Sequence, residues 1–100
     1  METQTIKQTV SKSIDYQKII LFGSRARGDH QEDSDWDILV LINEELTPRE
    51  KLPYRTNIRK DLLKYNIFSD ILIQSLSEFN RNKTLTSHIC QTIDKEGVEI

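Results

Sequence analysis

The 100-residue sequence contains one cysteine, Cys90, and only three glycines and two prolines. A single cysteine cannot form a disulfide within the chain, and it also excludes a cysteine-based zinc site. This usage of cysteine is typical of a reducing compartment. Internal repeats, low-complexity tracts and linkers are absent from the sequence. We therefore expect one domain that spans residues 1–100.

Long hydrophobic runs are also absent. The longest, Ile19–Phe22 and Ile38–Ile42, are far shorter than the roughly 20 residues that cross a bilayer. The first residues, Met1–Thr5, lack the basic and apolar regions of a signal peptide. We therefore expect a soluble cytoplasmic protein that does not associate with membranes.

The chain has little net charge, but its charges are unevenly distributed. The formal net charge is −2, and hydrophobic residues make up 36% of the chain, too many for a disordered segment. Residues 29–45 contain seven acids and no Lys or Arg, whereas residues 49–64 contain six basic residues and two acids. This arrangement argues against a uniformly basic nucleic-acid binder, so we expect no direct nucleic-acid partner.

Apolar spacing predicts several helices. Three segments carry apolar residues at every fourth position: Ile6, Val10 and Ile14 in residues 4–15, Tyr54, Ile58 and Leu62 in residues 48–65, and Leu85, Ile89 and Ile93 before Gly97. Thr47 and Pro48 are typical of a helix start, and Pro53 must either kink that helix or mark its true beginning. A short helix is also expected over residues 77–83.

Three apolar runs read as strands, over residues 18–23, 35–42 and 67–73. Apolar residues occupy both faces of the far half of the second run, which should therefore be buried on both sides. Strand and helix signals alternate along the chain. This alternation predicts an α/β (α+β) fold, a sheet covered by helices.

Asp35 and Asp37 are two residues apart at the head of the second strand. Their carboxylates should project from one face, about 6–7 Å apart, where they repel each other. A divalent cation between them would remove this repulsion, and oxygen ligands favour Mg²⁺ or Mn²⁺ over zinc. A third carboxylate, Asp70, lies in the apolar run Ile67–Ile73, where an isolated charge would be costly, so we expect either a strand-end residue that touches solvent or part of a shared site. If the two strands are neighbours, the three carboxylates can hold two metal ions.

The segment Gly23–Gly28, Gly-Ser-Arg-Ala-Arg-Gly, directly follows the first strand. Gly23 allows a close backbone approach, and the Ser24 hydroxyl and the following amides can donate to phosphate oxygens. Arg25 or Arg27 could neutralise a phosphate. The segment is neither a Rossmann fingerprint nor a P-loop, because the glycine and lysine positions of those motifs are not matched.

Two other interpretations of the acids compete with a metal site of this kind. Asp33, Asp35, Asp37 and Glu44 fall at positions 1, 3, 5 and 12 of a calcium-binding loop, but Ile38 replaces the glycine of position 6 and the flanking helices are missing. A solvated loop and strand end is the simpler alternative. It leaves the third carboxylate, in its apolar run, without an explanation.

Gly23-Ser24, ten intervening residues and Asp35-x-Asp37, with Asp70 in a later strand, together resemble the polymerase-β-like nucleotidyltransferase superfamily. The glycine segment and the run Ser34–Val40 are similar to those of minimal nucleotidyltransferases, small prokaryotic proteins commonly paired with a HEPN-domain protein. The resemblance covers roughly residues 17–98. It implies a small mixed sheet flanked by helices, with nucleotide bound beside the helix that follows the glycine segment.

The resemblance also implies a role for each motif residue. Gly23 and Ser24 would hold the triphosphate of ATP, and Asp35 and Asp37 would ligate Mg²⁺. Asp70 would ligate a second ion and accept the proton of the attacking hydroxyl. The implied reaction is attack on the α-phosphate, which releases pyrophosphate and leaves an adenylylated acceptor. All three carboxylates are present, so an active enzyme is expected.

In the HEPN-paired branch, the resemblance implies that the acceptor is a tyrosine hydroxyl of the HEPN toxin, whose RNase activity AMPylation silences. This chain would then be the antitoxin. One alternative is transfer of AMP to a small-molecule hydroxyl, although such relatives generally carry an additional helical domain. Another is a non-catalytic module that neutralises its partner by contact. A domain of this size has little surface from which to form a substrate pocket by itself. We therefore expect the acceptor to be recognised at a homo- or hetero-oligomeric interface.

Two further features have simpler expected roles. Lys51, Arg55 and Arg59 recur at every fourth position of a predicted helix, which indicates a solvated face, with docking to an acidic partner or RNA as the alternative. Trp36 lies on the strand face opposite the paired carboxylates, so we expect core packing rather than base stacking.

Overall fold

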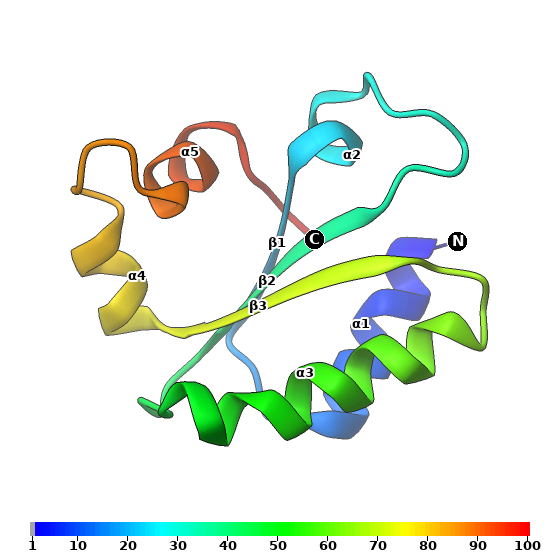
Figure 1. Ribbon diagram of the computed structural model, residues 1–100, viewed down its shortest axis with the longest axis horizontal. Helices are drawn as coiled ribbons and strands as arrows, with labels where there is room; N and C mark the ends of the chain where they lie inside the picture. The colour runs from blue at the N-terminus through cyan, green and yellow to red at the C-terminus, as the bar shows by residue number, and fades with distance from the viewer. Residues whose placement is uncertain (1) are drawn as a thin grey trace.

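The computed structural model describes residues 2–100, which form a four-stranded sheet with helices packed against it (Figure 1). The strands are β1 (Lys18–Phe22), β2 (Trp36–Ile42), β3 (Ser69–Ser75) and β4 (Val98–Glu99). The helices are α1 (Glu2–Ser13), α2 (Gly23–Arg27), α3 (Pro48–Leu63), α4 (Leu76–Asn82) and α5 (Ile89–Glu96). No helix within residues 2–100 combines the length and the apolar character needed to cross a bilayer.

The sheet is mixed, as the family resemblance implied. Its strand order is β3-β2-β1-β4. β1 pairs antiparallel with both β2 and β4, whereas β2 pairs parallel with β3. Because a parallel pair needs a long crossover, α3 connects β2 to β3 and packs against the sheet. The predicted fold class is confirmed.

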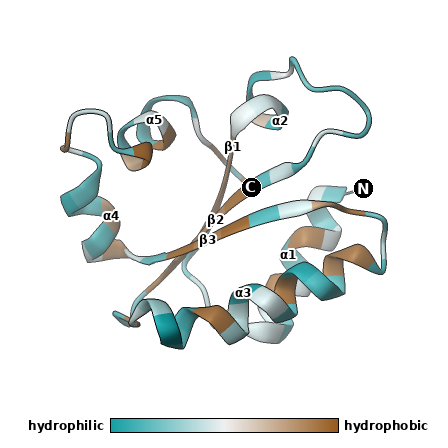
Figure 2. Cartoon of the chain, viewed as in Figure 1, coloured by the Kyte–Doolittle hydropathy of each residue, from teal (hydrophilic) through white to brown (hydrophobic). Residues whose placement is uncertain are grey.

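Two hydrophobic cores lie on the two faces of the sheet. One is formed against α1 and α3, with Ile6, Val10, Ile58 and Leu62 fully buried. The other is formed against α4 and α5, with Phe79, Cys90 and Ile93 buried. β2 contributes to both, so the far half of this strand is buried on both sides, as predicted. Figure 2 shows this concentration of hydrophobic residues on the central strands.

The start of α3 is where the sequence predicted it. Thr47 is the N-cap: its side chain accepts from the Glu50 backbone N at 3.2 Å, and Glu50 Oε1 accepts from the Thr47 N at 2.9 Å. These reciprocal bonds satisfy amides that the first helical turn leaves unpaired. Pro53 lies inside the helix, so it does not mark the beginning.

The last helix is shorter than its apolar spacing predicted. Leu85 lies outside it, and α5 begins at Ile89 because His88 Nδ1 accepts from the Cys90 N at 3.1 Å and caps the first turn. Leu85 and Ile89 are exposed, whereas Cys90 and Ile93 are buried. The buried face of α5 is therefore formed by Cys90 and Ile93, which are three residues apart. The predicted apolar stripe was wrong for Leu85 and Ile89. Gly97 ends the helix as expected.

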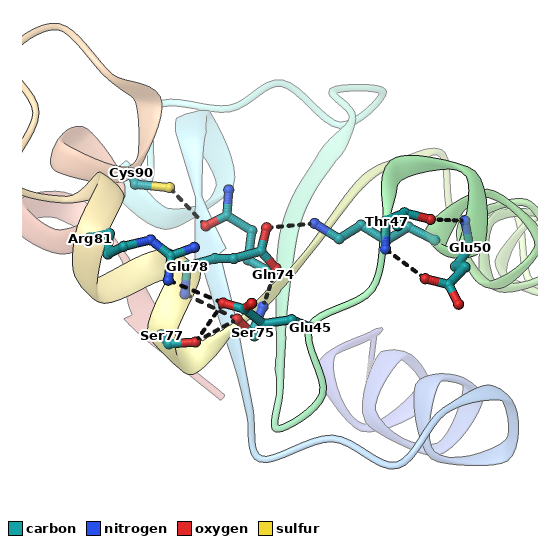
Figure 3. Close-up of polar contacts among 10 residues, drawn as sticks. Glu45, Thr47, Glu50, Gln74, Ser75, Ser77, Glu78, Arg81 and Cys90 are labelled. Carbon is teal, nitrogen blue, oxygen red and sulfur yellow. Dashed lines mark hydrogen bonds and ion pairs between the residues drawn. The ribbon is translucent and has the colours of Figure 1, made fainter.

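A polar network closes the end of β3 that is remote from Asp70 (Figure 3). Lys51 of α3 donates to Glu78 of α4 at 3.0 Å, and Glu78 also accepts from the Ser75 backbone N at 3.0 Å. Burial alone would raise the pKa of Glu78, but hydrogen bonds from the Ser75 backbone and Lys51 outweigh it and lower that pKa. The network thus ties α3 and α4 together across the end of the edge strand.

Candidate active site

The three predicted carboxylates lie together at one end of the sheet. Asp37 of β2 stands opposite Asp70 of β3 in the parallel register, and Asp35 immediately precedes β2. Burial raises the pKa of the Asp37 carboxyl, the negative charges of Asp70 and Asp35 raise it further, and Arg27 opposes them. Asp35 and Asp70 are therefore both close enough to Asp37 to act on it electrostatically.

Asp70 is exposed near the start of its strand, which is the first of the two expected explanations for a charge in this apolar run. β3 begins at Ser69, two residues later than expected, so Asp70 is the second residue of an edge strand and is exposed. The burial cost inferred from its apolar neighbours in sequence does not arise, because the residue is at the surface. What places Asp70 in the site is its register opposite Asp37.

Gly23 is held directly against the Asp37 carboxylate. It adopts a positive φ of 71°, and a Cβ built on it would overlap Asp37 Oδ2. Only glycine avoids both the left-handed strain and this overlap. The partly buried Ser24 follows immediately and begins α2 with it. The segment predicted to bind phosphate and the central carboxylate of the cluster are therefore adjacent.

The donor set fits Mg²⁺ or Mn²⁺ bound together with a nucleotide. Within residues 2–100, no three His, Cys, Asp or Glu side chains gather closely enough to hold a metal ion by themselves. Mg²⁺ commonly uses one or two protein carboxylates and takes its other ligands from water and substrate phosphates. Asp37 and an acidic neighbour meet that requirement, and Gly23 lets the backbone approach the Asp37 carboxylate, which fills the space that a side chain would take.

Arg25 holds the loop that leads into the site. Its Nη2 donates to the carbonyls of Glu32 and Ser34, each at 2.9 Å, and its guanidinium lies 4.6 Å from the centroid of the Trp36 ring. The sequence predicted that Arg25 could neutralise a phosphate. These contacts instead bind its guanidinium to the chain segment just before Asp35 and to the Trp36 ring. Spacing could not reveal this, because the acceptors are backbone carbonyls.

Arg27 lies closer to the carboxylates than these contacts place Arg25. It forms ion pairs with Asp29 at 3.2 Å and Glu96 at 3.7 Å, and its positive charge lowers the pKa of Asp37. Both pairs are at the surface and can exchange for a phosphate at little cost. Of the two predicted arginines, Arg27 is thus the better placed to meet one.

Replacing Arg25 by Lys should loosen residues 29–34. Lysine keeps the charge but cannot reach two carbonyls in a planar fork or stack as well on Trp36. We expect amide hydrogen exchange in residues 29–35 to accelerate by about tenfold, with roughly 1–2 kcal/mol lost from the free energy of unfolding. Arg27→Lys is the control and should leave exchange in this loop unchanged. Equal exchange in both variants would contradict the role assigned to Arg25.

Two cavities within residues 2–100 differ in their position relative to the carboxylates. The larger of the two, about 300 Å³, is lined by residues that include Ile14, Ile42 and Tyr54, at the opposite end of β2 from Asp37. The smaller, about 60 Å³, lies between α3 and β3 and is lined in part by Asp70. Of these two, the smaller one therefore reaches the carboxylate cluster.

The basic face of α3 is not simply solvated. Lys51 is largely buried against Glu78, and Arg55 Nε donates to the Ile71 carbonyl of the edge strand at 3.0 Å. Arg59 is exposed, with no partner among residues 2–100. Their regular spacing was visible in the sequence, but their place beside β3 depends on the strand order. Trp36 packs partly against the α1–α3 core, as predicted.

Comparison with known proteins is consistent with this geometry. Residues 4–100 match the family model described as polymerase beta, nucleotidyltransferase. A proposed protein adenylyltransferase of Methanocaldococcus jannaschii is 39% identical over 83 residues, which cover 83% of this chain and 77% of that protein.

Solved structures share the fold. A toxin–antitoxin complex with AMP-PNP contains a chain that is 23% identical, with a TM-score of 0.65 over 98% of this chain and 70% of that one. A complex of the tri-AMPylated Shewanella oneidensis HEPN toxin with its MNT antitoxin gives 20% identity and a TM-score of 0.62, over 99% of this chain and 71% of that one.

Proposed function

Because this chain belongs to the polymerase beta nucleotidyltransferase family, we propose that it transfers AMP from ATP to a hydroxyl, a tyrosine hydroxyl in the first instance, of a HEPN-domain toxin. In doing so it acts as the antitoxin of the pair. The observation that carries this proposal is the backbone of Gly23 held against Asp37, with Asp70 opposite in the sheet register. This arrangement supports the proposal because it brings together the residues to which we assign phosphate binding, metal binding and acceptance of the proton.

The relatives support the choice of donor and acceptor. The Methanocaldococcus jannaschii relative is named for adenylyl transfer to proteins, which favours ATP as the donor and a protein as the acceptor. The fold neighbours occur in toxin–antitoxin complexes, and one of those toxins carries AMP. A small-molecule acceptor or a purely non-catalytic antitoxin has no comparable support.

Each residue has a distinct task in the proposed reaction. The Gly23 backbone and the Ser24 hydroxyl hold the triphosphate, and Arg27 lies near enough to neutralise part of its charge. Asp35 and Asp37 would hold Mg²⁺, with Asp70 as a ligand of a second ion, and bound Mg²⁺ would offset negative charge on the phosphates. Asp70 accepts the proton of the attacking hydroxyl, whose oxygen bonds to the α-phosphorus as the bond to pyrophosphate breaks.

The test first asks whether the adjacent reading frame encodes a HEPN-domain protein. That protein is then incubated with the chain, ATP and Mg²⁺, and its intact mass is measured. We expect a gain of one or more AMP units, abolished in the Asp35→Asn/Asp37→Asn double variant and in a partner whose acceptor tyrosine is replaced by phenylalanine. Neutralisation of the toxin that persists undiminished in the double variant would refute the catalytic proposal. Replacing Mg²⁺ by Mn²⁺ in the same assay identifies the preferred ion.

A further inference from the structure

A small groove runs along the free edge of β3, on the side away from β2. We call it the β3-edge groove, and its lining residues are Leu52, Arg55, Thr56, Arg59, Asp70 and Ile71. It encloses about 60 Å³, far below the roughly 300–1,000 Å³ typical of small-molecule pockets. It has room for one or two side-chain groups, as expected of part of a protein–protein contact.

The lining of the groove carries two positive charges, Arg55 and Arg59, and one negative charge, Asp70. The two arginines differ in how they are held. Arg55 is anchored to the sheet edge through its bond to the Ile71 carbonyl, which leaves its outer nitrogens at the surface. Arg59 lies one helical turn further along α3, is exposed, and has no partner among residues 2–100. Both can still donate to an incoming carboxylate, and bidentate arginine–carboxylate pairs are among the stronger polar contacts.

An exposed apolar side chain lies beside these arginines. Leu52 lines the groove and is 56% exposed. Arginines are enriched at protein interfaces, where apolar side chains are buried beside them. The groove therefore suits a segment that brings both acidic and apolar side chains.

The position of the groove relative to the carboxylates is the decisive feature. Across the sheet lie, in order, Gly23 after β1, Asp37 on β2, Asp70 on β3 and then the groove beyond the edge. Figure 1 shows α3 running alongside β3, and residues of both elements line the groove. A nucleotide at Gly23 and a ligand in the groove would therefore approach Asp70 from opposite sides.

We propose that the β3-edge groove docks an acidic segment of the acceptor protein and thereby presents the acceptor hydroxyl to Asp70. The proposal rests on the proposed function in taking a protein as the acceptor and Asp70 as the group that receives its proton. The acidic residues 29–45 lead into the same carboxylate cluster and would repel a long polyanion such as RNA. A short segment with a few carboxylates can pair with Arg55 and Arg59 without crossing that region.

The test uses two synthetic tyrosine peptides that differ only in having glutamates or lysines beside the tyrosine. We expect the glutamate peptide to bind the chain about tenfold more tightly at low salt, as measured by fluorescence polarisation. Arg59→Glu should remove this preference, whereas Lys60→Glu, the same charge change at the next exposed position of α3, should leave it intact. Matching melting temperatures will confirm that both variants are folded.

Three results would overturn the proposal: equal binding of the two peptides, equal effects of the two variants, or single-stranded RNA binding that only Arg59→Glu abolishes. The peptide measurement needs no ATP, so it stands even if the wild-type chain transfers no AMP, a result that would refute the proposed function alone. With the HEPN-domain protein as acceptor, Arg59→Glu should raise the acceptor KM about tenfold and leave ATP binding unchanged.

Discussion

Replacing Asp37 by Asn is expected to reduce AMP transfer by at least about a thousandfold, because Asp37 is the central carboxylate to which we assign metal binding. The variant should nevertheless fold, and at neutral pH it should be at least as stable as the wild-type chain. Asn has nearly the same shape as Asp but removes a charge that burial, Asp70 and Asp35 all disfavour. Activity and stability are thus expected to change in opposite directions.

The sign of the pH effect follows from the raised pKa of Asp37. A group whose folded pKa lies above its unfolded value contributes stability below the unfolded pKa, and this contribution is lost as the pH rises through the folded pKa. At neutral pH the ionised Asp37 therefore opposes folding. Asp37→Asn should remove this part of the pH dependence, so that the stability difference between variant and wild type grows as the pH rises from the acid range and then levels off.

Asp33→Asn is the matched control, since it removes the same charge from an exposed residue of the loop before β2. It should retain nearly full transfer activity and show no comparable gain in stability. Transfer assays with ATP and Mg²⁺, together with urea unfolding across a pH series, measure both quantities. Transfer by Asp37→Asn within about tenfold of wild type, or a marked loss of its stability at neutral pH, would contradict the role assigned to Asp37.

The sequence sufficed for elements whose signals are local. Thr47 and Pro48 mark the start of α3 because capping depends on side chains within one helical turn. The apolar residues on both faces of the far half of β2 likewise predicted that both faces are buried. The short spacing of Asp35 and Asp37 also keeps them near each other: after burial and Asp70, the charge of Asp35 is a further cause of the raised pKa of Asp37.

Features that depend on strand order could not be predicted. Solvent exposure was one of the two expected explanations for Asp70, but the sequence could not select it, because nothing in residues 67–73 distinguishes an edge strand from a central one. The commitment of Arg25 to loop carbonyls, and the position of Arg59 beside Asp70, likewise require partners distant in sequence. In the last helix, His88 sets the start through a side-chain cap that apolar spacing does not report.

The second large expected effect concerns Gly23. An alanine there would be strained by the positive φ of 71° and would place its Cβ into Asp37 Oδ2, with Asp37 Cγ only 3.1 Å away. We expect Gly23→Ala to lower the free energy of unfolding by about 2–5 kcal/mol and to abolish AMP transfer, because the carboxylate must move. Denaturant unfolding and the transfer assay measure the two effects.

Gly28→Ala distinguishes the cost of backbone strain from the cost of the overlap with Asp37. Gly28 also has a positive φ, 83°, but a Cβ there would meet nothing within 4 Å. This variant should lose only about 1–2 kcal/mol, the cost of the left-handed backbone, and should keep most of its activity. Equal losses of stability in Gly23→Ala and Gly28→Ala would mean that the approach of Gly23 to Asp37 is unimportant.

A double-mutant cycle identifies the atom responsible. Asp37→Ala removes Oδ2 and Cγ and leaves its own Cβ 3.4 Å from the added methyl group, an ordinary contact. In that background, Gly23→Ala should cost no more than Gly28→Ala does in the wild-type chain. The two changes would then be strongly non-additive, as expected of groups in direct contact. Additive losses would show that Gly23 acts on stability independently of Asp37, and the link between the phosphate-binding turn and the central carboxylate would have to be abandoned.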